Sequence, residues 1–498
     1  MIKDLRNTFK QTAIYGLSNI FVKAAGLLLL PIYTSSLSLE EYGMLAMFEL
    51  ITQFFVGVIS FSLPASMLRV ASDTEDKKTQ NRIYFTAGVL LTGFCGAFLI
   101  LFLPLNGIFS SAIFDSDQYA SYFTIAFISI VLEIFGVLPM QLFRLREKSV
   151  NYLLFFLLKL GSLVGFVWYF VVLKEMGVYG ALLGVLASNA SLLIATLPMQ
   201  LRNLELKFDK KAAREMYAFG APLIFTTLSG TILTIADRII IEIYGQLSDL
   251  GIYTLAYKVG SLSNLLIIGT FALGFLPIAF KKFGDANFDR FYSKMFTYYM
   301  GLSIILTMVV SLFSKEGIKI ISSDNPDYWI AIMLVPFIAY VFLLKAIQTY
   351  LSYVFFLIKR TRYHAYITIF GVIINVALNF LLIPKFGMYG AILATGISYA
   401  AMCVYTFNLA QSNYPIVYEF KRIAVLMVSC AVFIALGIYF NDLDIIPRVL
   451  IKIGLVLGYG VFLYYAVADK VEREKIAKIT YLFRQGGIKA VIGSLKND

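Results

Sequence analysis

The sequence predicts an all-α polytopic membrane protein with about fourteen transmembrane helices. Its 498 residues are 59% hydrophobic and only 14% charged, and the mean hydropathy is +0.80. Soluble domains are about 45–50% apolar and about 25% charged, so a water-soluble fold would have nowhere to bury so much apolar surface. The apolar residues form runs of about 20, separated by short charged loops, and runs of that length span a bilayer as helices.

Each long apolar run predicts one helix. The first run contains Lys23 and lacks a small-residue cleavage site, so it indicates a spanning helix rather than a cleaved signal peptide. The expected helices are residues 11–36, 41–68, 83–105, 119–142, 151–173, 177–200, 216–244, 249–279, 291–314, 329–357, 364–383, 387–410, 423–440 and 448–468.

The net charge of +12 is mainly a topology signal. With the N-terminus inside, 31 of the 42 Lys and Arg residues fall on cytoplasmic segments and only 5 on outward loops. This asymmetry predicts a multi-pass membrane protein with both termini in the cytoplasm. The basic segments are expected to bind anionic membrane lipids, and no nucleic-acid partner is expected.

Two segments of the chain occur twice. Gly-Val-Tyr-Gly-Ala at residues 177–181 returns as Gly-Met-Tyr-Gly-Ala at residues 387–391, and Gly43 and Gly251 lie in a second related pair. The glycines predict tight turns and close helix approach. The repeat predicts two six-helix lobes of equal orientation, related by a pseudo-two-fold axis along the membrane normal. The expected domains are an N-terminal lobe (1–205), a C-terminal lobe (206–412), and two additional helices with a basic cytoplasmic tail (413–498).

Charged side chains inside the spans indicate where a substrate binds. Each costs about 2.5–3.5 kcal/mol on insertion scales, so each needs a partner or a function. We predict that the cations line a cavity between the lobes, because Arg and Lys in a low dielectric suit an anion such as a phosphate. These cations are Lys23, Lys159, Arg238, Lys258 and Lys345. The polar residues expected to line the same cavity are Asn19, Thr231, Thr234 and Ser261.

Carboxylates inside the spans have two interpretations. As candidates for coupling to H⁺ or Na⁺ we identify Glu49, Glu133 and Asp237. In the alternative, structural interpretation, the same carboxylates only neutralise nearby cations. The pairs of this structural interpretation are Lys23 with Glu49, Lys258 with Asp237, and Arg238 with Glu242.

Motifs for catalysis, nucleotide binding or metal binding are missing from the sequence. It contains no P-loop, no Gly-x-Ser-x-Gly and no metal-spaced set of Cys and His residues. The cysteines Cys95, Cys403 and Cys430 all fall inside apolar runs and are interpreted as small hydrophobic residues. We therefore expect a transporter that is not an enzyme, has no cofactor or metal site, and is driven by an ion gradient.

Several short motifs carry a resemblance to a known family. They are Leu-Glu-Glu-Tyr-Gly at 39–43, Pro222, Ala-Asp-Arg at 236–238, Leu-Gly-Ile-Tyr at 250–253 and Tyr-Lys at 257–258. With the Gly-x-Tyr-Gly-Ala repeats and the fourteen-helix plan, they extend over essentially the whole chain. In these features the chain resembles the bacterial O-antigen and capsule repeat-unit flippases, which are polysaccharide transporters of the multidrug/oligosaccharidyl-lipid/polysaccharide exporter superfamily.

The resemblance implies a MATE-like fold and a specific substrate. Such a flippase moves undecaprenyl-diphosphate-linked oligosaccharides from the cytoplasmic to the outer leaflet of the inner membrane by alternating access. The product feeds a glycan polymerase and its chain-length regulator in the synthesis of O-antigen of lipopolysaccharide, of capsule or of exopolysaccharide. Carried over to this chain, it favours Arg238, Lys258 and Lys23 as substrate-binding residues, followed by Lys159 and Lys345.

Three alternatives remain at this point. A lipid II flippase shares the fourteen-helix plan, and a multidrug/cation antiporter of the same superfamily would usually have twelve helices and an acidic cavity. A membrane-bound glycan polymerase or ligase belongs to a different class, and it would need a sizeable outward catalytic loop. The longest outward loop, at about residues 315–328, is too short to house one.

Overall fold

The computed structural model describes residues 26–323, 325–467 and 473–474, and all regular secondary structure in these ranges is helical. The described residues form two compact units. The first contains the residues up to Phe283 together with Ser314–Pro415, and the second contains Gly284–Phe313 and the residues from Ile416 onward. The predicted all-α class is confirmed.

Within the described ranges, eleven helices are long and apolar enough to cross a membrane. One of them, α16 (Arg362–Asn413), contains two of the expected spans, which join at a kink at Gly387. The expected span 249–279 is divided between α11 (Leu247–Gly260) and α12 (Leu262–Lys282), and most of the expected span 11–36 lies outside the described residues. This inventory confirms a polytopic membrane protein.

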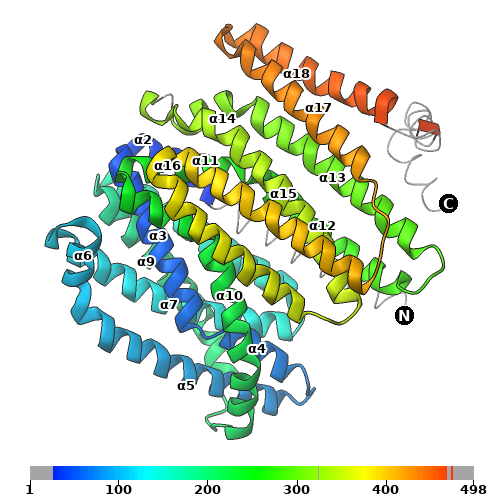
Figure 1. Cartoon of the computed structure of the whole chain (residues 1–498). Coiled ribbons are helices and arrows are strands. Elements are labelled where there is room, and N and C mark those ends of the chain that lie inside the picture. Colours follow the sequence, from blue (N-terminus) through cyan, green and yellow to red (C-terminus); the bar gives the residue numbers. More distant parts are fainter. Residues whose placement is uncertain (1–25, 324, 468–472, 475–498) are drawn as a thin grey trace, which may run out of the picture. The chain divides into compact units, whose positions relative to one another are not determined.

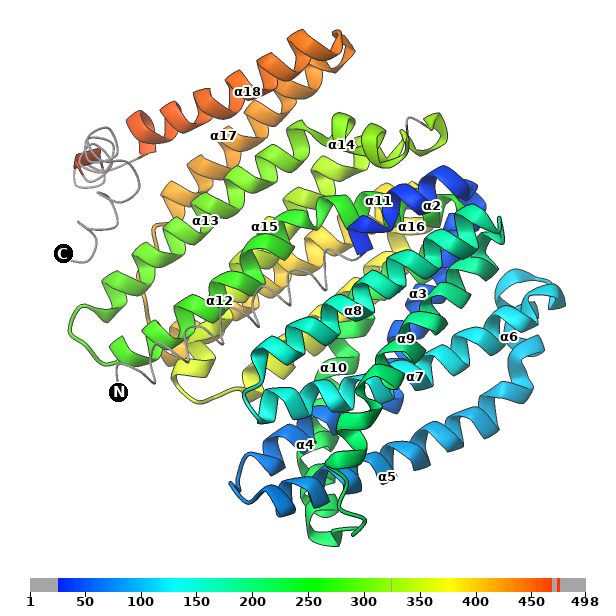
Figure 2. The same ribbon diagram turned by 180° about the vertical axis from the view of Figure 1, so that it is seen from behind.

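The first unit contains most of the helices (Figure 1). They are α2 (Leu30–Ser36), α3 (Leu39–Ile59), α4 (Leu63–Ala71), α5 (Lys77–Phe102), α6 (Asn106–Phe114), α7 (Ala120–Leu145), α8 (Ser149–Val167), α9 (Gly177–Arg202), α10 (Lys210–Tyr244), α11, α12, α14 (Ser314–Ile321), α15 (Ala331–Leu357) and α16. Helices α7, α8 and α9 pack against one another and run side by side in Figure 2. Helix α3 packs against α11 and α10, and α10 and α15 both pack along α16.

The second unit is a smaller group of helices. It contains α13 (Phe288–Leu312), α17 (Phe420–Tyr439) and α18 (Ile445–Phe462), which pack on one another. Two basic residues of α18, Arg448 and Lys452, are buried in this unit. The Arg448 guanidinium donates hydrogen bonds to the carbonyl oxygens of Asn441 and Leu443, both at 3.1 Å, which satisfies its charge locally.

The expected helix 41–68 is interrupted, so the prediction of one continuous helix is wrong there. Helix α3 ends at Ile59, and Phe61 and Ser62 adopt left-handed backbone conformations with φ of 46° and 53°. Helix α4 then begins at Leu63 with Pro64 in its first turn. Proline has no N–H and clashes with a preceding helical turn, so it fits the start of a helix better than its middle.

The glycines of the repeated Gly-x-Tyr-Gly-Ala segments form the tight turns that the sequence predicts. Gly177 and Gly387 adopt φ values of +55° and +53°, which glycine reaches without a Cβ clash. A Cβ on Gly180 would lie 2.9 Å from the carbonyl oxygen of Phe170, and one on Gly390 would overlap that of Leu382. Each segment therefore reverses the chain and lets the following helix pack closely on the preceding one.

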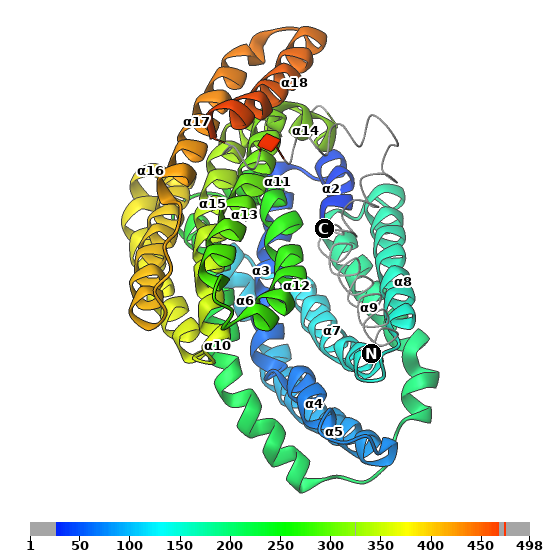
Figure 3. The same cartoon turned by 90° about the vertical axis from the view of Figure 1, so that its right-hand side faces the viewer.

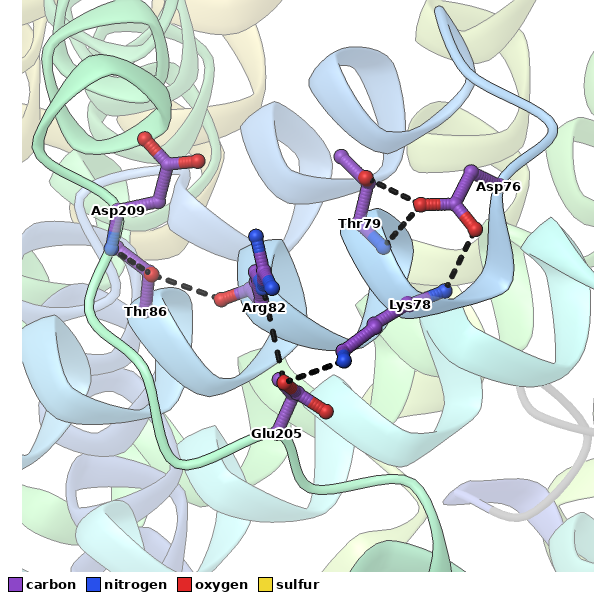
Figure 4. A network of polar contacts seen from close by, with 7 residues as sticks. All are labelled: Asp76, Lys78, Thr79, Arg82, Thr86, Glu205 and Asp209. Atoms are coloured by element: carbon purple, nitrogen blue, oxygen red, sulfur yellow. Dashed lines mark hydrogen bonds and ion pairs between the residues drawn. The ribbon is translucent and has the colours of Figure 1, made fainter.

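The segment that leads from α9 into α10 is tied to α5 by polar contacts (Figure 4). Glu205 Oε1 lies 3.8 Å from Lys78 Nζ and 3.7 Å from Arg82 Nε. The backbone N–H of Asp209 donates to Thr86 Oγ1 at 3.0 Å. In Figure 3 this segment passes below α4 and α5 before α10 begins. The contacts fix the start of α10, the helix that carries Arg238.

Candidate functional site

The starts of α3 and α11 are locked together by capping and by close backbone packing. In α3, the Ser38 N–H donates to Glu41 Oε2 at 2.9 Å, and the Glu41 N–H donates to Ser38 Oγ at 3.2 Å. Gln246 and Asp249 form the corresponding capping box of α11. A Cβ on Gly43 would overlap the carbonyl oxygen of Leu247, so the two backbones are in contact at this position. This contact sets which residues of α3 and α11 face each other further along.

Lys258 of α11 forms an ion pair with Glu49 of α3. Lys258 Nζ lies 2.8 Å from Glu49 Oε2 and 3.0 Å from Oε1. The Lys258 side chain is 20% exposed, whereas the Glu49 side chain is 41% exposed. Lys258 therefore pairs with Glu49 rather than with Asp237, the partner that the structural interpretation of the sequence assigned to it.

Arg238 of α10 stacks on an aromatic ring of α11. Its guanidinium carbon lies 4.1 Å from the centroid of the Tyr257 ring, within the range of a cation–π interaction. Arg238 Nε is buried and has no hydrogen-bond partner within the described ranges. Stacking leaves the edge of a guanidinium available for a planar acceptor such as a phosphate or a carboxylate.

Lys345 of α15 lies close to two further aromatic rings. Its Nζ is 5.5 Å from the centroid of Phe342 and 5.9 Å from that of Tyr399. Phe342 also packs edge-on against Tyr257, at 5.4 Å between centroids. Aromatic rings thus connect Arg238 of α10 with Lys345 of α15 through Tyr257 and Phe342, and Lys258 follows Tyr257 directly in α11. We call this group the cation–aromatic cluster and define it as Arg238, Tyr257, Lys258, Phe342, Lys345 and Tyr399.

Asp237 lies beside this cluster but does not face open space. Its side chain is buried, and its carboxylate accepts hydrogen bonds from Tyr253 Oη at 2.6 Å and from the backbone N–H of Arg238 at 2.9 Å. The bond from Tyr253 joins α11 to α10 at the residue that precedes Arg238. The arrangement fixes the orientation of Arg238 relative to Tyr257.

The polar residues expected to line the cavity are only partly described. Thr234 Oγ1 bonds back to the Thr231 carbonyl at 2.7 Å, and Ser261 Oγ bonds back to the Lys258 carbonyl at 3.0 Å. Thr231 is half-buried and faces Gly57 of α3. Lys23 and Asn19 lie outside the described residues.

Glu133 and Lys159 lie in a different pocket. It is formed by α7, α8 and α9, has a volume of about 150 Å³, and is also lined by Gln141 and Tyr152. Of the four expected cations that the structure describes, Arg238 and Lys345 share linked aromatic rings, Lys258 follows Tyr257 in α11 and pairs with Glu49, and Lys159 lies in this other pocket.

The aromatic members of the cluster are the part that sequence reasoning missed. The sequence singles out Tyr257 only within the Tyr-Lys motif at 257–258, and it does not single out Phe342 or Tyr399 as candidates. The turn at residues 245–246 supplies a signal, because residues equally far from a helical turn lie side by side in the hairpin. By that rule Arg238 falls beside Tyr253 and Asp237 beside Thr254, and Tyr257 lies about one helical turn further in.

Comparison with known sequences places this architecture in a family. The family described as "Polysaccharide biosynthesis protein" matches residues 8–283, more than half of the chain. The chain belongs to this family. A second family, MatE, matches residues 222–381, which include most of α10 and all of α11 and α15.

A curated relative matches part of this chain. The chain is 22% identical over 260 residues to the probable low-salt glycan biosynthesis flippase Agl15 of Haloferax volcanii. The match covers 52% of this chain and 54% of the relative, so the chain spans about half the length of that protein.

Solved structures confirm the fold. The lipid II flippase MurJ, in an inward closed conformation, matches with a TM-score of 0.72 at 14% identity over 91% of this chain and 99% of that chain. An inward-facing multidrug resistance MATE family transporter of the MOP superfamily matches with a TM-score of 0.65 at 15% identity over 81% of this chain and 95% of that chain. The fold of this family member is MATE-like.

Proposed function

We propose that this protein translocates undecaprenyl-diphosphate-linked oligosaccharides from the cytoplasmic to the outer leaflet of the bacterial inner membrane. The observation that carries the proposal is the cation–aromatic cluster, in which Arg238 and Lys345 contact linked aromatic rings and Lys258, next to Tyr257 in α11, pairs with Glu49. Cations inside a membrane are costly, and a diphosphate supplies the charge that would offset them.

Different residues of the cluster would contact different parts of a lipid-linked glycan. The diphosphate would contact Arg238, whose guanidinium presents paired donors, and Lys258 as a point charge. Aromatic rings such as Tyr257 and Tyr399 and hydroxyls such as that of Thr231 would contact the sugars, whose faces are partly apolar and whose edges form hydrogen bonds. The isoprenoid tail would stay in the bilayer.

The transport step would follow alternating access between the N-terminal lobe (1–205) and the C-terminal lobe (206–412). With these bounds all members of the cluster belong to the C-terminal lobe, and its Lys258 pairs with Glu49 of the N-terminal lobe. An ion gradient would drive the step, with Glu133 as a candidate coupling residue in its separate pocket. The positive-inside pattern supports cytoplasmic termini, and a glycan polymerase with its chain-length regulator would use the flipped product.

A lipid II flippase is the second candidate, because the fold matches MurJ over 91% of this chain. Lipid II also carries its glycan on a lipid diphosphate, so the cluster would suit both substrates. The two candidates differ in which lipid-linked intermediate accumulates when the protein is removed.

The test combines depletion with variants in the source organism. Depletion should cause undecaprenyl-diphosphate oligosaccharide to accumulate on the cytoplasmic face, with loss of O-antigen, capsule or exopolysaccharide and intact peptidoglycan. Arg238→Ala and Lys258→Ala should each abolish surface polysaccharide while the protein remains in the membrane. Accumulated lipid II would indicate the second candidate, whereas drug sensitivity with normal glycans would indicate a multidrug exporter.

A further inference from the structure

Glu49 is the carboxylate through which α3 reaches the cation–aromatic cluster. Both of its oxygens lie within 3.0 Å of Lys258 Nζ. The pair is not sealed, because the Glu49 side chain is 41% exposed and the Lys258 side chain only 20% exposed. A ligand therefore has access to the pair from the Glu49 side.

The helices that carry the pair are held in place independently of it. The Gly43 backbone contacts Leu247, and the Gly251 position contacts the Leu39 carbonyl oxygen, so α3 and α11 are fixed at their starts. Glu49 follows Gly43 by six residues, or roughly 9 Å along the helix axis. Its flexible side chain can leave Lys258 by rotation alone, without any movement of α3.

The second carboxylate at the cluster is not free to exchange. Within the described ranges, Asp237 and Glu49 are the carboxylates that form hydrogen bonds or ion pairs with residues of the cluster. Asp237 is buried and holds Tyr253 and the backbone of Arg238. Glu49 is thus the exchangeable negative charge of the site, and without it the cluster would present three cations with no mobile counterion.

We propose that Glu49 is an exchangeable counterion: it occupies Lys258 in the empty transporter, and the diphosphate of the substrate displaces it. This inference rests on the proposed function. The exchange keeps Lys258 paired throughout the cycle, which lowers the cost of an isolated buried cation. It also makes release favourable, because the returning carboxylate competes with the departing diphosphate.

The simplest test measures binding of inorganic pyrophosphate to the purified full-length protein in nanodiscs. Glu49→Gln keeps the shape of the side chain and removes the competing charge. It should bind pyrophosphate at least about threefold more tightly than the unaltered protein, because an exposed to half-buried ion pair contributes on the order of 1 kcal/mol. Lys258→Gln should bind more weakly than the unaltered protein.

A control variant separates this effect from a general change in charge. Glu40 is an exposed carboxylate in the first turn of the same helix. Glu40→Gln should leave pyrophosphate affinity unchanged. If Glu40→Gln tightened binding as much as Glu49→Gln, the long-range charge of α3 would explain the result and the exchange would be refuted.

Transport provides an independent readout. In liposomes, Glu49→Gln should translocate lipid-linked oligosaccharide several-fold more slowly in spite of its tighter binding, because release loses its competitor. A Glu49 that is only structural would, when replaced, weaken both binding and transport. Equal or weaker pyrophosphate affinity in a folded Glu49→Gln protein overturns the proposal.

The variants also keep the inference distinct from the proposed function. If the unaltered protein binds no pyrophosphate and Lys258→Gln changes nothing, the proposed function fails. If the unaltered protein binds and Lys258→Gln weakens binding, but Glu49→Gln does not tighten it, only the counterion exchange fails. Should Glu49→Gln not fold, Glu49→Asp replaces it: its shorter reach weakens the pair, so tighter binding supports the exchange and unchanged or weaker binding refutes it.

Discussion

Helices α3 and α11 share their first turns and differ in their centres. Each begins with a capping box, and each has a glycine five residues after the N-cap residue, Gly43 in α3 and Gly251 in α11, at the contact between the two backbones. Six or seven residues further on, α3 contributes the carboxylate of Glu49, whereas α11 contributes Tyr257 and Lys258.

The comparison separates what builds the helix pair from what gives it chemistry. Close packing of two helices requires small residues on both partners, so the related segments keep the same residue type at the contact. Recognition of an anion needs cations, and these gather on α10, α11 and α15 while α3 supplies the opposite charge. Helices α3 and α11 thus have similar first turns and different central residues, and this arrangement suits a substrate that has a charged group at one end.

The largest expected effect comes from a substitution that disrupts the contact between the first turns of α3 and α11. Gly43→Ala places a Cβ where the Leu247 carbonyl oxygen lies, so α3 and α11 must separate. Overpacking against backbone costs typically 1–3 kcal/mol and sometimes more, so we expect the melting temperature of the purified protein to fall by at least several degrees.

The matched control for this substitution is Gly93→Ala in α5, where a Cβ would meet no atom within 4 Å. Alanine favours a helix over glycine by roughly 0.5–1 kcal/mol, so this variant should melt at the same temperature or slightly higher. Equal melting temperatures for both variants would show that the α3–α11 contact is looser than described.

Much of the fold follows from the sequence because its signals are local. Apolar runs define the spans, and the glycines at 177 and 387 mark the turns where the backbone is left-handed. The interruption between α3 and α4 was harder to predict, because Pro64 is compatible both with a bent helix and with a new helix start. Only the packing around the left-handed Phe61 and Ser62 decides between these possibilities.

The site was less predictable, because it depends on contacts between distant residues. The charges of Glu49 and Lys258 are evident in the sequence, but their pairing depends on how α3 and α11 are aligned over a separation of 209 residues. In the sequence, Lys159 and Lys345 are equally good candidates for the site, because each is an isolated cation in an apolar run. The structure distinguishes them by placing Lys345 beside Phe342 and Tyr399, and Lys159 in the pocket between α7, α8 and α9.

The second prediction concerns the centre of α11. Tyr257→Leu removes the ring on which Arg238 stacks, and cation–π contacts of partly desolvated groups contribute about 1–2 kcal/mol. We expect pyrophosphate affinity to fall about fivefold to thirtyfold. Tyr257→Phe keeps the ring and should retain most of the affinity. Equal losses in both variants would assign the role to the hydroxyl and contradict the stacking.

A smaller effect is expected from the cations outside the α3–α11 pair. Lys345→Gln removes a charge that adjoins the cation–aromatic cluster, so pyrophosphate affinity should fall by about threefold to tenfold, as for a half-buried charge. Lys159→Gln should change this affinity by less than about twofold, because Lys159 lies in the pocket with Glu133. The reverse order would move the anion site to the first lobe.

The smallest expected effect comes from Asp76, the N-cap residue of α5, which lies outside the contact between α3 and α11. Asp76 caps α5 by accepting hydrogen bonds from the Lys78 and Thr79 backbone N–H groups and from the Thr79 hydroxyl, and these bonds lower the pKa of its carboxyl group (Figure 4). Because the folded pKa is lower than the unfolded one, the charged cap stabilises the protein above about pH 4, and this contribution is lost as the pH falls through the folded value.

Asp76→Ala should therefore melt slightly below the unaltered protein at pH 7, and the difference should narrow near pH 3. Asp76→Asn keeps an acceptor without the charge, so its deficit should be smaller and should also vanish at low pH. A deficit that grows as the pH falls would mean that the pKa of Asp76 is raised by folding rather than lowered, so that the negative charge of its carboxylate does not contribute to this cap.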